Sequence, residues 1–543
     1  MDTRRLILFV IFSFSIMMLW DAWQQKNNPT PIVQTSPSTN GVPTPGSAAS
    51  TTQTNVNDGS FKLTNGQRIK VKTDLFEAEI DTTGGDLRRL VLNKHAASDT
   101  KNGNFVLMDD AFKPMFYVAQ SGLMGADLPN HKSQFTSTAN SYTLLDGQES
   151  QEVRLSWAGN GVTVDKIYTF HRNNYVIDVR YQINNASAAA ITPSAYYQIV
   201  HDSESNQGSM MMPTFTGGAY FTEADKFKKI KFGEMEKTNL SKTAKDGWVG
   251  LVQHYFASAW IPKAGVEREF YTKKLSDNIY AVGVVTPNTS IAAGTTTEFG
   301  AQLFAGPQNE DVLTKAAPGL EFAVDYGWLT IIAKPLFWVL SKIHGLVNNW
   351  GVAIILLTIL IKAVFFPLSA ASYKSMAQMR ELAPRLQSMK EKFGDDKQKM
   401  QQAMLEMYRT EKINPMGGCL PIIVQIPVFI ALYWVLLASV ELRHAPFFGW
   451  IQDLSATDPW FILPILMGAT MIIQTFLNPA PTDPIQAKVM KVMPVVFSVF
   501  FFFFPAGLVL YWLVNNILSI AQQWYVNKTI HAAALAKKGV SKK

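Results

Sequence analysis

The chain has 543 residues, 47% of them hydrophobic, and a formal net charge of +7. Its single cysteine excludes an internal disulfide, and its eight histidines form no HxxH or HxxxH pair, which argues against a metal site. The excess lysine and arginine lies near the ends of apolar runs and in the tail, a distribution typical of membrane topology signals and lipid headgroup contact rather than of nucleic-acid binding.

The N-terminus carries an apolar run at residues 6–20 directly after Arg4 and Arg5. A cleaved signal peptide has the same pattern, but no small-x-small cleavage site follows this run. We therefore predict an uncleaved transmembrane anchor over residues 1–24, with its N-terminus in the cytoplasm. Residues 25–57 are rich in Pro, Ser, Thr and Asn and predict a flexible linker.

Residues 58–320 alternate apolar and polar side chains with a period of two, as in VIDVRYQI at residues 176–183. Glycine-containing turns such as Thr83-Gly84-Gly85-Asp86 recur between the alternating stretches. Many short strands over this length predict a large antiparallel β-sandwich. Because one membrane crossing precedes it, the sandwich is expected outside the cytoplasm.

The apolar stretch at residues 327–345 is interrupted by Lys334 and Pro335. We predict an interfacial amphipathic helix within residues 321–348 rather than a membrane span. Four apolar runs follow, at about 350–370, 417–440, 460–477 and 489–527. The last run is too long for one helix, and FPAG at residues 504–507 divides it. The core at residues 349–527 then has five spans, or six transmembrane helices with the N-terminal anchor.

The distribution of basic residues supports this topology. Nine lysines and arginines lie between residues 373 and 415, whereas the loop at residues 441–459 carries only Arg443, and the tail at residues 528–543 is basic again. Six spans place the basic loop and the tail in the cytoplasm, as the positive-inside rule requires. Both termini are therefore expected in the cytoplasm.

The basic loop at residues 373–415 predicts a hairpin of two helices. Gly394 ends the first helix, and Asp395 or Asp396 caps the second. Methionines recur along both helices at spacings of three and four residues, as at Met376, Met379, Met389, Met400, Met404 and Met407. These stripes either join the two helices or form a mobile surface that contacts varied apolar segments.

Lys362 lies inside an apolar run, VAIILLTILIKAVFFPL, at residues 352–368. In a straight helix it is about 16 Å from Gly351, near the middle of a hydrocarbon core about 30 Å thick. A lysine there costs about 2.5–3.5 kcal/mol. Its side chain either extends toward the cytoplasmic interface or faces a wet cavity.

Polar residues on the same span and on the other spans favour the cavity. They are Thr358, Gln425, Gln474, Thr475, Tyr511, Asn515, Ser519 and Gln522. Helices normally turn such polar faces toward shared water at membrane depth, so we predict a hydrated groove with Lys362 as its only charge. The amides, Gln474 above all, also suit hydrogen bonds that only join helices.

Several long motifs resemble the Gram-negative branch of the YidC/Oxa membrane protein insertase family. They are PLSAASYKSMAQMRELAPRLQ, EKINPMGGCLPIIVQIPVFIALYWVL, SVELRHAPF, LSATDPWFILPILMGATM and FPAGLVLYWLVNN. The resemblance implies an α-helical polytopic membrane protein of the bacterial inner membrane with a large periplasmic all-β supersandwich domain. It also implies an insertase and chaperone that acts alone or with the Sec translocon, without an enzymatic reaction or a cofactor.

The resemblance further implies partners and site residues. The implied partners are nascent membrane proteins, ribosome-nascent chain complexes and the lipid bilayer, with no nucleic-acid site except a ribosome contact by the basic tail. The charge of the family's groove, often arginine, maps to Lys362, which cannot form arginine's fixed fork. The aromatic pair that contacts substrates maps to Tyr511 and Trp512. The other expected groove residues are Thr358, Gln425, Asn515 and Ser519.

Two other classes of function fit the sequence less well. A polytopic transporter or channel would have paired internal repeats, and the sequence contains none. An envelope enzyme that uses the β-domain would need a catalytic constellation, and no paired-carboxylate or triad motif stands out in the sequence.

Overall fold

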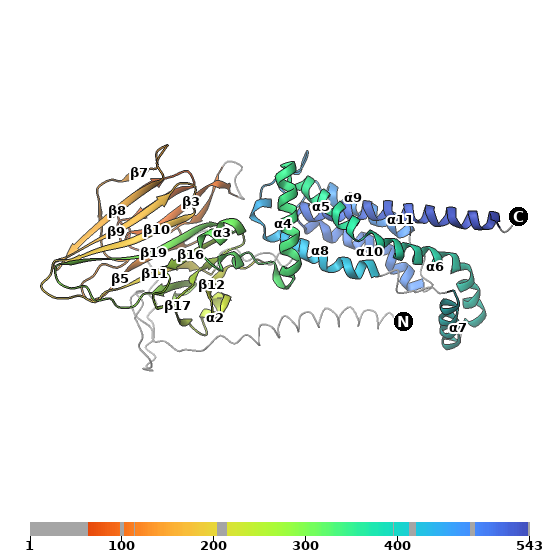
Figure 1. Cartoon of the computed structure of the whole chain (residues 1–543), viewed down its shortest axis with the longest axis horizontal. Coiled ribbons are helices and arrows are strands. Elements are labelled where there is room, and N and C mark those ends of the chain that lie inside the picture. The colour runs from red at the N-terminus through yellow and green to blue at the C-terminus, as the bar shows by residue number, and fades with distance from the viewer. Residues whose placement is uncertain are drawn as a thin grey trace. The chain divides into compact units, whose positions relative to one another are not determined.

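The computed structural model describes residues 63–97, 103–112, 115–203, 214–394, 396–411, 420–477 and 484–540. The predicted anchor, the predicted linker and Cys419 lie outside the described residues. The chain divides between Val324 and Asp325 into two compact units, an N-terminal β unit and a C-terminal helical unit (Figure 1).

The β unit contains two large sheets. The first has ten strands, in the order β14 (Ser241–Ala244), β17 (Arg268–Ser276), β18 (Ile279–Val285), β11 (Ser194–Asp202), β5 (Tyr117–Met124), β3 (Asp86–Ala96), β2 (Phe76–Asp81), β1 (Arg68–Lys72) and β7 (Ser141–Thr143), with β4 (Asn104–Met108) paired to β3. The second has nine strands, in the order β13 (Lys226–Ile230), β12 (Gly217–Thr222), β15 (Trp248–Val252), β16 (Phe256–Pro262), β19 (Thr295–Pro307), β10 (Val176–Asn185), β9 (Val162–His171), β8 (Ser150–Gly159) and β6 (Thr136–Ser137). The short helices of the unit are α2 (Phe232–Met235), α3 (Glu310–Ala316) and η1 (Leu320–Ala323).

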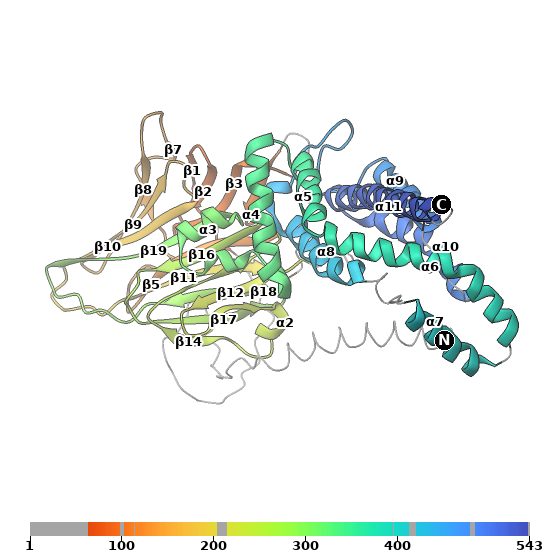
Figure 2. The same cartoon turned by 45° about the vertical axis from the view of Figure 1, so that its right-hand side comes forward.

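The predicted antiparallel β-sandwich is confirmed (Figure 2). Neighbouring strands pair in antiparallel fashion, except β1 with β7. In β10, the predicted inward residues are fully buried, at 0% exposure for Ile177, Val179, Tyr181 and Ile183. The two sheets pack face to face, since Tyr197 of β11 lies 5.1 Å from Trp260 of β16 between ring centroids.

A cluster of buried charges joins the two sheets. Lys166 of β9 is fully buried and donates hydrogen bonds to the carbonyl oxygens of Gly84 (3.0 Å) and Ser121 (3.1 Å). Its ammonium lies 3.9 Å from the carboxylate of Asp86, which also lies 3.4 Å from the guanidinium of Arg88. Burial raises the pKa of Asp86 to about 6 and lowers the pKa of Lys166 to about 8. Desolvation therefore outweighs the mutual attraction of these charges.

The helical unit carries most of its residues in long helices. Its elements are η2 (Gly327–Leu329), α4 (Thr330–Val347), α5 (Trp350–Val364), α6 (Phe366–Phe393), α7 (Lys397–Thr410), α8 (Leu420–Ala438), η4 (Val440–Leu442), α9 (Ile462–Leu477), α10 (Pro484–Phe500), η5 (Phe501–Phe503) and α11 (Ala506–Val540). Within the described residues, the stretch Gly327–Val347 is the one unbroken helix long and apolar enough to cross a membrane. The interfacial position of this segment and the number of spans stay predictions.

The expectation of one straight helix over residues 350–370 is wrong. α5 ends at Val364, and α6 continues at an angle of 66° to it. Pro367 stands within the first two positions of α6. Proline has no N–H to continue the helical ladder, and it disfavours the helical conformation of the residue before it. Lys362 consequently lies in the last turn of α5, not in the middle of a longer helix.

The hairpin is made of α6 and α7, which lie side by side at their shared end (Figure 2). The helix break falls at Gly394 as predicted, and the carboxylate of Asp396 caps α7 by accepting a hydrogen bond from the N–H of Lys399 at 3.1 Å. An ion pair of 2.7 Å joins Arg385 of α6 to Glu411, directly after α7.

The division of the last apolar run at residues 504–505 is confirmed, because α11 begins at Ala506. The tail at residues 528–543 was predicted only as a basic segment, but α11 continues through it to Val540. The tail is rich in alanine and lysine, which favour helix, and carries no glycine or proline before Gly539. A helix of this length spans about 50 Å, more than a hydrocarbon core of about 30 Å.

The segment between α8 and α9 is held by one buried carboxylate. Asp458 is 1% exposed and accepts hydrogen bonds from the indole N–H of Trp450 (3.0 Å) and from the backbone N–H groups of Trp460 (3.0 Å) and Leu463 (2.7 Å). The indole rings of Trp450 and Trp460 stack at 5.9 Å. Asp458 therefore fixes the start of α9.

Candidate functional site: a polar cavity among apolar helices

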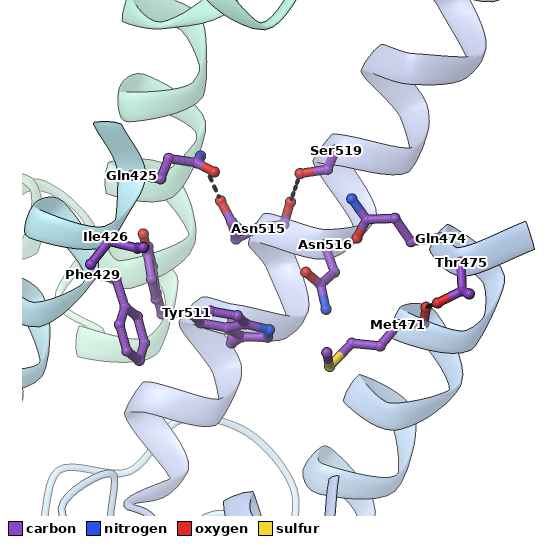
Figure 3. A pocket seen from close by; sticks show the side chains of 11 residues that line it. Gln425, Ile426, Phe429, Met471, Gln474, Thr475, Tyr511, Asn515, Asn516 and Ser519 are labelled. Atoms are coloured by element: carbon purple, nitrogen blue, oxygen red, sulfur yellow. Dashed lines mark hydrogen bonds between the residues drawn. The ribbon is translucent and has the colours of Figure 1, made fainter. Parts of the chain in front are cut away.

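A cavity of about 280 Å³ lies between α8, α9 and α11 (Figure 3). It is lined by Gln425, Ile426, Phe429, Met471, Gln474, Thr475, Tyr511, Trp512, Asn515, Asn516 and Ser519. The three helices are otherwise strongly apolar, and no charged residue occurs in α8, in α9 or in α11 before Lys528. The lining thus combines amides, hydroxyls and aromatic rings without a carboxylate.

One face of α11 supplies the predicted polar stripe. Tyr511, Asn515 and Ser519 follow one another at intervals of four residues and all line the cavity. The amide N–H of Gln425 on α8 donates to the side-chain oxygen of Asn515 at 3.3 Å, and the hydroxyl of Ser519 donates to the backbone carbonyl of Asn515 at 2.7 Å (Figure 3). The bond from Gln425 ties α8 to α11 on one side of the cavity, and the bond from Ser519 lies within α11.

The cation approaches the cavity from α5. The ammonium of Lys362 donates to the hydroxyl of Ser519 at 2.6 Å, and the side chain of Lys362 is 3% exposed. The amide N–H of Gln522 donates to the backbone carbonyl of Lys362 at 3.4 Å. Ser519 belongs to the cavity lining, whereas Lys362 does not. In this conformation the charge therefore lies behind Ser519.

Thr358 does not join the cavity. It is 1% exposed, and its hydroxyl donates to the backbone carbonyl of Ile354 in its own helix at 2.6 Å. The structure thus brings five of the seven predicted groove residues together around one cavity, namely Gln425, Tyr511, Trp512, Asn515 and Ser519. Lys362 contacts this set through one hydrogen bond.

Aromatic rings close one end of the cavity. Phe429 of α8 lies 4.5 Å from Trp512 in an edge-on arrangement and 6.2 Å from Tyr511 in a stacked one, between ring centroids. The indole nitrogen of Trp512 is buried and has no hydrogen-bond partner among the described residues. This end offers aromatic faces together with one N–H donor.

α9 forms the remaining side, and here sequence reasoning missed several residues. The sequence indicates Gln474 and Thr475 as polar residues of this site. It does not indicate Met471 and Asn516, or Ile426 and Phe429 on α8, which also line the cavity. The amide N–H of Asn516 donates to the hydroxyl of Thr470 on α9 at 3.3 Å. The signal was present in the consecutive asparagines at residues 515 and 516, which point to α8 and to α9 respectively (Figure 3).

The donor set of the helical unit does not suit a metal. Within the part of the chain that the structure describes, no group of three or more His, Cys, Asp or Glu side chains could hold a metal ion. What the cavity offers instead is hydrogen bonding, aromatic contact and a neighbouring cation, in a surrounding of apolar helices.

Two family models together match most of the chain. The model of the YidC periplasmic domain matches residues 68–339, and the model of the 60Kd inner membrane protein matches residues 342–533. Both descriptions agree with a β unit followed by a helical membrane unit.

Curated relatives match over the full length. The membrane protein insertase YidC of Methylobacillus flagellatus is 65% identical, over 99% of this chain and 99% of its own length. The protein of the same name from Aromatoleum aromaticum is 53% identical, over 98% of each chain. A solved structure of an active YidC insertase aligns with 85% of this chain and 93% of its own, at 20% identity and a TM-score of 0.40. Because the two family models and these full-length relatives match, the chain belongs to the YidC family of membrane protein insertases.

Proposed function

We propose that this chain inserts membrane proteins, here called clients, by receiving a polar segment of the client in the cavity between α8, α9 and α11. The observation that carries the proposal is a cavity lined by polar side chains among apolar helices, with one cation at its edge. The segment received is the part of the client that must reach the extracytoplasmic side, and it is often acidic.

The cavity lowers the main cost of insertion. Polar and peptide groups that enter hydrocarbon without partners cost several kcal/mol each, in round terms about 2–7. Gln425, Asn515 and Gln474 offer amide donors and acceptors at the cavity wall. A client segment that hydrogen-bonds there crosses part of the membrane without losing all of its partners.

The direction of movement follows from charge and hydrophobicity. A membrane potential that is negative inside favours outward movement of an acidic group by about 2.3 kcal/mol per charge per 100 mV. Lys362 attracts the acidic group as a point charge. The apolar helix of the client then enters the bilayer sideways, and its transfer from water drives the step. No covalent step is involved.

Partners and topology belong to the same proposal. The hairpin of α6 and α7, whose methionines are only partly buried, contacts the apolar segment of the client first. The chain works alone or beside the Sec translocon, receives ribosome-nascent chain complexes, and also assists folding. It is a multi-pass inner-membrane protein with both termini in the cytoplasm.

Site-specific photocrosslinking to an arrested nascent client tests the proposal. A photoreactive residue replaces Gln425 or Tyr511, and the control replaces Ile517, which lies on α11 but is 49% exposed and outside the cavity lining. We expect client adducts from the two cavity positions at several times the control yield. Equal yields from cavity and control positions would count against the proposal.

A further inference from the structure

The hydroxyl of Ser519 connects the cation, α11 and the cavity. It accepts a hydrogen bond from the Lys362 ammonium at 2.6 Å and donates one to the carbonyl of Asn515 at 2.7 Å, and Ser519 also lines the cavity. In α6, Tyr373 is 8% exposed, and its hydroxyl approaches the same Ser519 side chain. Three helices thus meet at one hydroxyl.

Within the described part of the chain, no carboxylate pairs with the ammonium of Lys362. It has three N–H donors, and among the described residues its one hydrogen-bond acceptor is Ser519. This arrangement holds the charge in place but leaves donors for a stronger acceptor.

We propose that Ser519 is a positioning residue that keeps Lys362 in a resting position outside the cavity lining, and that an acidic client group enters by taking over this hydrogen bond. The inference rests on the proposed function and adds a regulatory step to it. A carboxylate replaces the serine hydroxyl as acceptor, and the flexible lysine side chain turns into the cavity. Clients without an acidic group leave the Lys362–Ser519 bond intact.

Ser519 therefore controls how readily the Lys362 ammonium can turn into the cavity and contact an acidic client group. Without the hydroxyl, the resting position loses a hydrogen bond to a charged group, and the ammonium is expected to turn toward the polar cavity. Selection for acidic clients then becomes stronger rather than weaker. A purely structural role of Ser519 would instead lower the insertion of acidic and neutral clients alike.

The first test measures the exposure of Lys362 without any client. The full chain in proteoliposomes is treated with a small, membrane-permeant amine-acylating reagent, and mass spectrometry compares modification of Lys362 with that of the exposed Lys488. We expect about tenfold more Lys362 modification in Ser519→Ala, and a wild-type level in Ser519→Thr, which keeps the hydroxyl. Equal modification in wild type and Ser519→Ala would overturn the proposal.

The second test adds clients that differ by a single Asp→Asn change in the translocated tail. Ser519→Ala is expected to raise the ratio of acidic to neutral insertion, and Ser519→Thr to restore it. If Ser519→Ala increases Lys362 modification but leaves the ratio of acidic to neutral insertion unchanged, the proposed link between the Lys362–Ser519 bond and client entry is overturned. Loss of photocrosslinks from the cavity would contradict the proposed function itself, so the two failures are distinguishable.

If the Ser519 variants do not fold, the proposal can still be tested on the wild-type chain. An arrested client with an acidic tail should change Lys362 modification relative to the same client with the amide tail. Identical modification with both clients would overturn the proposal.

Discussion

Removal of the positive charge at Lys362 should selectively impair the insertion of clients with an acidic translocated tail. Lys362→Met keeps an unbranched side chain of similar length and removes the one charge of α5. Because Lys362 is 3% exposed and has no carboxylate partner among the described residues, its replacement by an apolar residue leaves no opposite charge unpaired. The folded state should therefore tolerate the change.

The magnitude follows from the contact that the client would lose. A hydrogen bond that involves a charged group contributes about 1.5–3 kcal/mol. Each 1.4 kcal/mol is a factor of ten, so the preference for an acidic over an amide tail should fall by about 10- to 150-fold in Lys362→Met. Lys362→Glu should abolish insertion of the acidic client, because like charges repel. Lys362→Arg keeps the charge and should retain most of the preference.

The assay is insertion into proteoliposomes of two clients that differ only by Asp→Asn in the translocated tail. Protease protection of the tail measures insertion, and the ratio between the two clients removes differences in the amount of active protein. The same ratio for wild type, Lys362→Met and Lys362→Glu would refute the reasoning, because the charge would then have no role.

Two further predictions concern positions outside the cavity. Since burial raises the pKa of Asp86 to about 6, above an unfolded value of about 3.9, its protonation stabilises the folded β unit as the pH falls through 6, by up to about 3 kcal/mol. Asp86→Asn should remove this gain in stability. Protection factors from hydrogen exchange of β3 and β5, measured at pH 7 and pH 4.5, report the gain. The same pH dependence in the wild type and in Asp86→Asn would contradict the prediction. Asp458→Ala leaves three N–H donors without their acceptor and should lower the free energy of unfolding by about 2 kcal/mol or more. Thermal unfolding in detergent measures this change, with the exposed Gln452→Ala as control, and equal midpoints would argue against a role of Asp458 in fixing α9.

Much of the fold was predictable because local pattern and burial coincide. The alternation in β10 predicted its buried face, and the polar stripe of α11 predicted one wall of the cavity. Gly84 and Gly85 predicted a turn, and both have positive φ, at 76° and 59°. A Cβ at Gly84 would lie 2.3 Å from the carbonyl oxygen of His131, so the turn also requires the close approach that glycine permits.

The position of Lys362 relative to the cavity could not be predicted from spacing. Periodicity places residues on a helix face but does not reveal where the helix bends, and the 66° change of direction between α5 and α6 removes Lys362 from mid-helix. The hydrogen bond to Ser519 joins residues 157 positions apart in the sequence. Pro367 was the local signal for the bend, hidden within an otherwise continuous apolar run.

The helical tail was missed for a different reason. The positive charge of the tail predicted a topology signal and a contact with lipid headgroups or the ribosome, but alanine and lysine also favour helix. Asn516 was missed because residues at intervals of four lie on one face of α11. The cavity is lined from two faces of this helix, and Asn516 lies on the second.

We propose that the cavity between α8, α9 and α11 holds water among apolar helices. Thiol reactivity tests it most directly, in a Cys419→Ser background that removes the single native cysteine. Cysteines at positions 425 and 515 are compared with one at the outward-facing position 517, using a small water-soluble thiol reagent on the full chain in vesicles. If the cavity holds water, positions 425 and 515 will react many times faster than position 517. Equally slow reaction at all three positions would contradict it.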